Sequence, residues 1–173
     1  MSGWKKIKEE PIKDGYRKII RKIFELSNGD VFDFEIKKEK PAACVLALTK
    51  EEKVILAKQF RPGPEKIVLE LPGGVIEDGE TAEDAMRREL REETGYEGDF
   101  QFIGQSLDCA YSTMIRSNFV ATNCTKVQEI KTDKNEFSEV VLMDLADFRK
   151  HLRNGQLTDV ETGYLGLDFL NLL

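Results

Sequence analysis

The chain has 173 residues, of which 40% are hydrophobic and 34% are charged, as expected for a small soluble protein with a substantial core. A net charge of -6 argues against a general nucleic-acid-binding protein, because such proteins usually carry a basic excess. No apolar run approaches the roughly 20 residues of a membrane helix. The first residues, MSGWKKIKEE, lack the apolar core of a signal peptide. We therefore expect no nucleic-acid or membrane partner.

Cysteine and histidine usage narrows the possible chemistry further. Cys44, Cys109 and Cys124 stand in apolar or strand-like contexts without CxxC spacing, which favours buried thiols in a reducing cytoplasm. His151 is the only histidine, so neither a histidine-based zinc site nor a Ser-His-Asp triad is expected.

The first half of the chain has the pattern of consecutive β-strands. Alternation predicts strands at residues 15–25 and 30–37, joined by a turn at Ser27-Asn28-Gly29-Asp30, where Asn-Gly is a strong hairpin signal. The continuous apolar run at residues 42–48 predicts a buried strand, and residues 54–60 predict the next one.

Residues 67–96 indicate a strand, a glycine loop and a helix in that order. The apolar run Ile67-Val68-Leu69 is followed by Leu71-Pro72-Gly73-Gly74, and the helix then begins near Thr81. Thr81 and Asp84 resemble a capping box, and Gly95 is placed to end the helix. An apolar stripe in this helix would dock it on a core.

Three glutamates of this helix fall at positions i, i+3 and i+4, which share one helix face: Glu89, Glu92 and Glu93. Carboxylates gathered in this way repel one another unless a cation lies between them. Hard divalent cations such as Mg²⁺ prefer carboxylate, phosphate and water oxygens. The pattern therefore predicts a metal site, with a solvated acidic helix face as the alternative interpretation.

The second half of the chain alternates strands with two further helices. Strands are predicted near residues 100–107, 118–123 and 138–143, and helices at residues 144–154 and 159–173. Strands interrupted by a few helices predict an α+β or mixed α/β protein.

Residues 74–96, GVIEDGETAEDAMRRELREETGY, resemble the Nudix box, whose fixed spacing is filled throughout. The resemblance implies a Nudix fold, an α/β/α sandwich with a mixed sheet and an N-terminal antiparallel hairpin. It also implies hydrolysis of a nucleoside diphosphate linked to another group. Tyr96 occupies a usually aliphatic position, a departure that concerns packing.

Matching the motif position by position implies the roles of its residues. The metal ligands would be Glu89, Glu92, Glu93 and the carbonyl of Gly73, holding Mg²⁺ with Mn²⁺ as an alternative. Glu80 and Arg88, together with Gly74, would brace the turn between the loop and the helix.

The surrounding sequence is similar to ADP-ribose pyrophosphatases and related nucleotide-sugar hydrolases. The similarity lies in Gln59-Phe60-Arg61-Pro62, in residues 69–74, in the string from residue 135 to 141 and in the tail Gly155-Gln156-Leu157-Thr158-Asp159. It implies that Arg61 holds the substrate phosphates, for which the guanidinium fork is well suited. It also implies a homodimer in which residues 1–40 form dimerising strands and residues 41–173 form the hydrolase domain.

One loop departs from these relatives. A proline is expected about sixteen residues beyond the box by that resemblance, yet the chain has Asp108-Cys109-Ala110-Tyr111-Ser112-Thr113-Met114 there. Tyr111 could contact a base or sugar of the substrate, or it could simply fill the loop. The departure leaves the substrate open.

The general base is the second open assignment. The resemblance favours a glutamate on a loop before the last strand, where Glu136 matches best among Glu129, Asp133, Glu136 and Glu139. Glu89 is the other candidate, and a merely solvated loop is the alternative for residues 126–139.

Together these features predict a divalent-metal-dependent pyrophosphohydrolase that cleaves ADP-ribose or a related nucleoside diphosphate sugar. The alternatives are hydrolysis of dinucleotides or modified nucleoside triphosphates, a non-catalytic nucleotide sensor with this fold, and a pure scaffold module.

Overall fold

The structure, a computed structural model, describes residues 3–130 and 139–173. The chain forms two compact units. The N-terminal unit comprises Met1–Pro41 and Leu107–Ile115, and the main unit comprises Ala42–Ser106 and Arg116–Leu173. A loop from the second half of the chain therefore belongs to the N-terminal unit.

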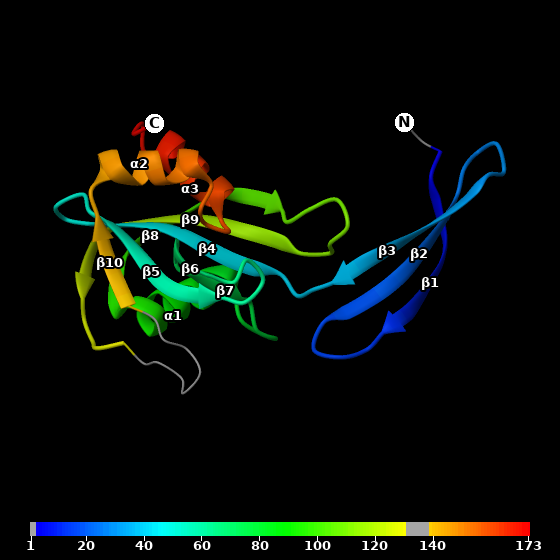
Figure 1. Ribbon diagram of the computed structural model, residues 1–173, viewed down its shortest axis with the longest axis horizontal. Helices are drawn as coiled ribbons and strands as arrows, with labels where there is room; N and C mark the ends of the chain where they lie inside the picture. The colour runs from blue at the N-terminus through cyan, green and yellow to red at the C-terminus, as the bar shows by residue number, and fades with distance from the viewer. Residues whose placement is uncertain (1–2, 131–138) are drawn as a thin grey trace. The chain divides into compact units, whose positions relative to one another are not determined.

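The N-terminal unit is a three-stranded antiparallel sheet in the order β1-β2-β3 (Figure 1). Its strands are β1 (Lys5–Lys13), β2 (Lys18–Glu25) and β3 (Val31–Lys38). The predicted hairpin is formed by β2 and β3, and Gly29 adopts a left-handed φ of 88° in its turn. The sequence did not predict β1, because KKIKEEPIK has no regular alternation of apolar residues.

The two faces of this small sheet differ in character. Ile20 pairs with Ile36 and Phe24 pairs with Phe32, so one face is apolar and aromatic. Trp4 adds to this face, with its ring centroid 5.8 Å from that of Phe32. Alternate residues of the same strands present charged groups on the opposite face.

The main unit contains a mixed sheet in the order β10-β5-β4-β9-β8, in which β4 runs parallel to β9 and antiparallel to β5. Its long strands are β4 (Ala42–Thr49), β5 (Val54–Arg61), β8 (Tyr96–Leu107), β9 (Ile115–Lys126) and β10 (Glu139–Met143). Two short strands complete it: β6 (Lys66–Glu70) pairs with β5, and β7 (Gly73–Val75) pairs with β4.

Helices cover both faces of the main sheet (Figure 1). Helix α1 (Ala82–Thr94) lies on one face, and α2 (Leu145–Asn154) and α3 (Val160–Phe169) lie on the other. Every residue of β4 is buried, and alternate residues face opposite layers. Val45 packs in the α1 layer, whereas Leu46 packs in the layer of α2 and α3. The predicted α/β/α sandwich is confirmed.

The ends of α1 follow the signals read in the sequence. The Thr81 hydroxyl accepts a hydrogen bond from the Asp84 N–H, and Gly95 ends the helix with a left-handed φ of 77°. These caps satisfy backbone groups that a helix end would otherwise leave without partners. They fix where the helix begins and ends, and therefore which residues its acidic face presents.

Two details correct or extend the sequence expectations. Cys44 and Cys124 are buried as predicted, but Cys109 is exposed, because it lies in the loop that belongs to the N-terminal unit. His151 is half-buried, and its Nε2 lies 2.8 Å from the carbonyl oxygen of Leu69. No helix in the described ranges is long and apolar enough to cross a bilayer.

Candidate active site

Two glycines let β7 lie unusually close to its neighbours. A Cβ at Gly73 would lie 2.7 Å from the carbonyl oxygen of Ala43 on β4. A Cβ at Gly74 would lie 2.3 Å from Oε1 of Glu89 on α1. A side chain at Gly73 would push β7 away from β4, and a side chain at Gly74 would displace the Glu89 carboxylate. The Gly-Gly pair therefore sets the position of the helix carboxylates against the turn.

Arg88 links the loop before α1 to the acidic face of the helix. Its Nε and one terminal nitrogen contact both Glu80 oxygens at 2.9 and 3.0 Å, a bidentate arrangement. The other terminal nitrogen lies 2.7 Å from Glu89 Oε1 and 3.4 Å from Glu92 Oε2. The hydrogen bond from Arg88 lowers the pKa of Glu80, and the Glu80 and Glu89 carboxylates raise the pKa of Arg88.

Glu89 is more enclosed than Glu92 on the acidic face of the helix. Its side chain is 17% exposed, compared with 48% for Glu92. Burial raises the pKa of Glu89, and the Arg88 guanidinium partly opposes this shift. A nearby cation would stabilise the ionised form of such a buried carboxylate.

Glu93 points toward the glycine turn and accepts a hydrogen bond from the Gly73 N–H at 3.1 Å. Helix and turn therefore approach each other through Glu93 as well as through Glu89. Within residues 3–130 and 139–173, no three acidic, histidine or cysteine side chains converge closely enough to form a metal site as they stand. Glu89 and Glu92 are instead directed to Arg88.

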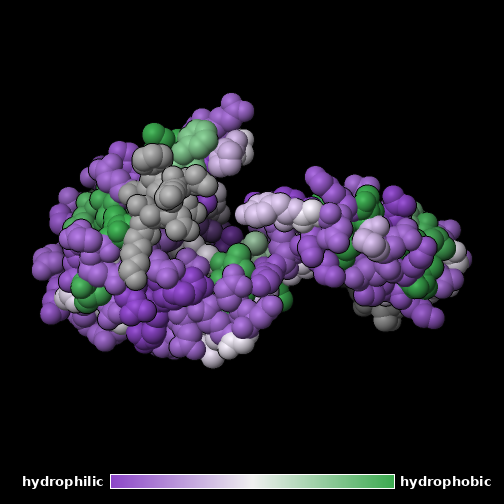
Figure 2. All heavy atoms as spheres, turned by 90° about the horizontal axis from the view of Figure 1, so that it is seen from below, coloured by the Kyte–Doolittle hydropathy of each residue, from purple (hydrophilic) through white to green (hydrophobic). Residues whose placement is uncertain are grey.

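The donor set nevertheless fits a hard divalent cation. All three side chains are carboxylates, and carboxylate oxygens are ligands that hard divalent cations prefer. The close approach at Gly74 leaves room for the Glu89 carboxylate and for no additional side chain. Hydrophilic residues also cover most of the main-unit face seen in Figure 2.

Arg61 lies at the end of β5 and forms an ion pair with Glu70 of β6. The Arg61 side chain is 39% exposed, whereas that of Glu70 is fully buried. The second Glu70 oxygen accepts a hydrogen bond from the Thr158 hydroxyl at 2.5 Å. The structure thus gives Arg61 a fixed, buried anion as its partner.

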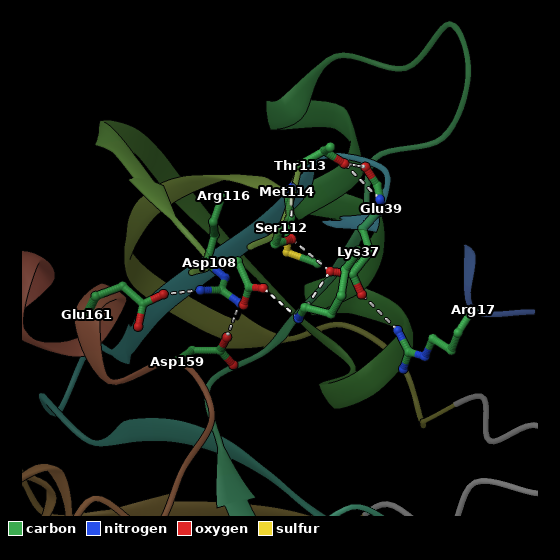
Figure 3. Close-up of polar contacts among 10 residues, drawn as sticks. All are labelled: Arg17, Lys37, Glu39, Asp108, Ser112, Thr113, Met114, Arg116, Asp159 and Glu161. Carbon is green, nitrogen blue, oxygen red and sulfur yellow. Dashed lines mark hydrogen bonds and ion pairs between the residues drawn. The ribbon is translucent and has the colours of Figure 1, made fainter. Parts of the chain in front are cut away.

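Glu70 lies within residues 69–74, for which the sequence similarity implied no individual role. The signal was a charged residue between Leu69 and Leu71 in an otherwise apolar strand, since an acid buried there needs a partner. Arg116 forms a second cluster of ion pairs, with Asp159 at 3.1 Å and with Glu161 (Figure 3). Its members are far apart in the sequence, so no local pattern indicated it.

Tyr111 belongs to the N-terminal unit, where the loop from Asp108 to Met114 is attached to β3 (Figure 3). The Lys37 N–H donates to the Tyr111 carbonyl at 2.8 Å, and Lys37 Nζ contacts Asp108 at 2.9 Å. The Tyr111 ring lies 6.3 Å from that of Phe34 and is 55% exposed as a residue. The loop joins the small sheet through a parallel bridge between Lys37 and Ser112. Glu136 lies outside the described residues.

Comparison with known proteins identifies the family. Residues 38–160 match the NUDIX domain. An ADP-ribose pyrophosphatase of Bacillus subtilis is 34% identical over 151 residues, which are 86% of this chain and 81% of that protein. A methanol dehydrogenase activator of Bacillus methanolicus is 30% identical with the same coverage. A mouse ADP-sugar pyrophosphatase is 60% identical over 48 residues, 28% of this chain and 22% of its own length.

The fold agrees with this result. A crystal structure of an ADP compounds hydrolase superposes with a TM-score of 0.80 at 20% identity, covering 100% of this chain and 98% of the other. At that identity the likeness concerns the fold. The domain match and the long alignments show the family itself: the chain belongs to the Nudix family and is a Nudix hydrolase.

Proposed function

We propose that this hydrolase uses Mg²⁺, or Mn²⁺ in its place, to cleave the diphosphate of ADP-ribose or a related nucleoside diphosphate sugar. The products would be a nucleoside monophosphate and a sugar phosphate. The names of two relatives support this substrate class: an ADP-ribose pyrophosphatase and an ADP-sugar pyrophosphatase. The domain match supports the hydrolase chemistry.

The observation that carries the proposal is the approach of α1 to the glycine turn. Gly74 leaves space for Glu89, Gly73 donates to Glu93, and Arg88 ties this face to Glu80. These contacts bring several carboxylates of the main unit close to the glycine turn. We assign Glu89, Glu92, Glu93 and the Gly73 carbonyl as the metal ligands, and Gly74, Glu80 and Arg88 as the groups that support them.

The bound cation would neutralise charge that develops on the phosphate oxygens and lower the pKa of the attacking water. The protein's own groups supply the rest of the chemistry. Arg61 would bind the diphosphate oxygens. A carboxylate would accept a proton from the attacking water while the water oxygen bonds to one phosphorus atom. The bond between that phosphorus and the bridging oxygen would then break, and the bridging oxygen would leave with the second phosphate.

Two carboxylates remain candidates for the proton acceptor. Glu89 is described, and its raised pKa results from burial, with Arg88 opposing. Glu136 was predicted from the resemblance and lies outside the described residues, so its role stays a prediction. Glu136→Gln in single-turnover assays tests the assignment, since loss of a general base lowers the chemical step itself. An unchanged single-turnover rate in Glu136→Gln would leave Glu89 as the candidate.

Glu93→Gln tests the central proposal. Glutamine keeps an oxygen that can accept from the Gly73 N–H but removes the charge that a cation needs. We expect turnover of ADP-ribose with Mg²⁺ to fall by about 10²-fold or more, while the melting temperature changes by only a few degrees. Turnover would be measured by separating nucleotide products, and stability by thermal unfolding.

Glu83→Gln is the matched control, because Glu83 lies on the same helix and pairs with Arg87 at 2.7 Å on the surface. It should leave turnover unchanged. Undiminished Mg²⁺-dependent turnover in Glu93→Gln would overturn the proposal. A panel of ADP-ribose, GDP-mannose, NADH, diadenosine polyphosphates and deoxynucleoside triphosphates separates the alternative substrates. Tight binding of one compound without product would indicate a nucleotide sensor.

We further propose that the chain acts as a homodimer through the strands of residues 1–40. The apolar face of the N-terminal sheet supports this, because Trp4 is 56% exposed and Phe32 is 45% exposed as residues. Large exposed apolar faces usually mark interaction sites. The three free cysteines support a reducing compartment, and we propose the cytoplasm.

A further inference from the structure

Glu70 is a fully buried carboxylate with both oxygens engaged. One oxygen accepts from Arg61 Nε, and the other accepts from the Thr158 hydroxyl at 2.5 Å. A charge without water or partners is costly to bury, so these two contacts determine the orientation of the carboxylate. Glu70 is therefore held rigidly, and it presents one oxygen to Arg61.

The strand register explains how Arg61 and Glu70 meet. Ala57 of β5 pairs with Glu70 of β6, and Arg61 lies four residues beyond Ala57 in an unbroken register. Residues four apart on a strand, and residues directly opposite on paired strands, project from the same face. Arg61 and Glu70 therefore project from the same side of the β5–β6 pair.

The contact with Glu70 leaves the terminal nitrogens of the Arg61 guanidinium available for binding. Glu70 engages Nε, the nitrogen nearest the aliphatic stem. Among the residues that the structure describes, Glu70 is the anionic partner found for Arg61. The terminal nitrogens retain donors in the planar fork that matches phosphate oxygens. A carboxylate at Nε restricts rotation of this fork, and such preorganisation favours binding in one orientation.

Thr158 connects this pair to the start of α3. Its hydroxyl lies 2.5 Å from Glu70 and 3.1 Å from Asp159, which in turn pairs with Arg116 at 3.1 Å. Thr158 therefore stands between two anchored acids. Its side chain cannot turn away from Glu70 without losing a hydrogen bond in a partly buried site.

We propose that Glu70 is a positioning residue for substrate binding: it fixes the Arg61 guanidinium toward the substrate diphosphate, and Thr158 fixes Glu70. The inference rests on the proposed function, because it takes Arg61 as a diphosphate ligand. It goes further by assigning a role to a buried acid and to the threonine that precedes α3. If the ion pair between Glu70 and Arg61 were purely structural, it would stabilise the fold without affecting how Arg61 binds the substrate.

A double-mutant cycle separates these two roles. The kcat/KM for ADP-ribose with Mg²⁺ is measured for the wild type, Glu70→Gln, Arg61→Ala and the double variant, together with each melting temperature. We expect Glu70→Gln to lower kcat/KM about tenfold, mainly through KM, and to add less than about twofold once Arg61 is alanine. Equal losses in both backgrounds would overturn the inference, as would no loss in the wild-type background.

Asp144→Asn is the control, because Asp144 forms an exposed ion pair with Lys53. It should leave kcat/KM unchanged in both backgrounds. If Glu70→Gln fails to fold, Thr158→Val takes its place in the cycle, with a smaller expected loss of about threefold and the same dependence on Arg61. Equal losses for Thr158→Val in both backgrounds would likewise overturn the inference.

A failure of the proposed function would look different. If the wild type turns over no nucleoside diphosphate compound, the same cycle is read from the dissociation constant of ADP measured by calorimetry. Coupling between Glu70 and Arg61 in that constant supports the positioning role although hydrolysis has failed. Additive effects in a wild type that does hydrolyse ADP-ribose overturn the positioning role and leave the proposed function standing.

Discussion

The two units of the chain use the same kind of element but bury it to different extents. In the main unit every residue of β4 is buried, whereas in the N-terminal unit no residue of β1 is. Among the described residues of the N-terminal unit, the buried hydrophobic side chains are Ile20 and Ile36. A two-layer core stabilises the main unit from within, whereas a small sheet with one apolar face gains stability by covering that face.

The largest expected effect concerns the core of the main unit. Phe148 of α2 is fully buried in the layer shared with Leu46 and Leu152. We expect Phe148→Ala to lower the free energy of unfolding by about 3–5 kcal/mol, because it removes apolar area and leaves a cavity. Urea unfolding followed by circular dichroism measures this loss.

Phe148→Leu should lower the free energy of unfolding less than Phe148→Ala does. It replaces the alanine variant in the test if that variant does not fold. Lys150→Ala, at an exposed position of the same helix, should change stability by less than about 0.5 kcal/mol. A loss below about 1 kcal/mol for Phe148→Ala would contradict the view that the main unit is stabilised by its own core.

A change in the N-terminal unit should instead alter association. Phe32→Asp places a charge within the aromatic face beside Trp4. We expect the wild type to sediment as a dimer and Phe32→Asp to shift toward monomer, because burying an unpaired carboxylate at an interface is costly. Sedimentation velocity at several concentrations measures the change.

The neighbouring variant Asp33→Asn serves as the comparison, since adjacent strand residues project from opposite faces. Asp33 contacts Arg21 at 3.2 Å on the charged face, so this variant should remain dimeric. A wild type that sediments as a monomer, or a Phe32→Asp variant that stays dimeric, would remove the proposed role of this face.

The smallest effect is a difference in thiol reactivity between the units. Cys109 is exposed in the N-terminal unit, whereas Cys44 and Cys124 are buried in the main unit. Burial raises the pKa of Cys124 to about 11, and burial also raises the pKa of Cys44. At pH 8 a thiol with a pKa of about 11 is ionised in about one molecule in a thousand, and the thiolate is the reactive form.

Ellman's reagent at pH 8 should therefore modify one thiol rapidly in the folded protein and the remaining thiols only after denaturation. Cys109→Ser should remove the rapid phase. Rapid modification of a second thiol in the folded protein would show that the main unit opens more readily than its buried strands indicate.

Several elements could be predicted because their causes are local. The continuous apolar run from residue 42 to 48 predicted β4, and the Thr81 and Gly95 signals predicted the ends of α1. The charged strand β1 was not predicted, because it forms through pairing with β2 and its own sequence lacks a strand pattern. Cys109 was predicted to be buried because its local sequence is apolar. In the structure it is exposed, in a loop that belongs to the N-terminal unit.

The motif in residues 74–96 was enough to predict the family from sequence. Its spacing also predicted the acidic helix face, because the helix repeat brings residues three and four apart onto one face. Only the tertiary structure showed that Arg88 engages Glu80 and Glu89 together, and that Glu70 is buried between Arg61 and Thr158. Glu70 and Thr158 are 88 residues apart in the sequence. The buried Glu70 carboxylate depends on the Thr158 hydroxyl for a hydrogen bond, and no local sequence pattern contains that dependence.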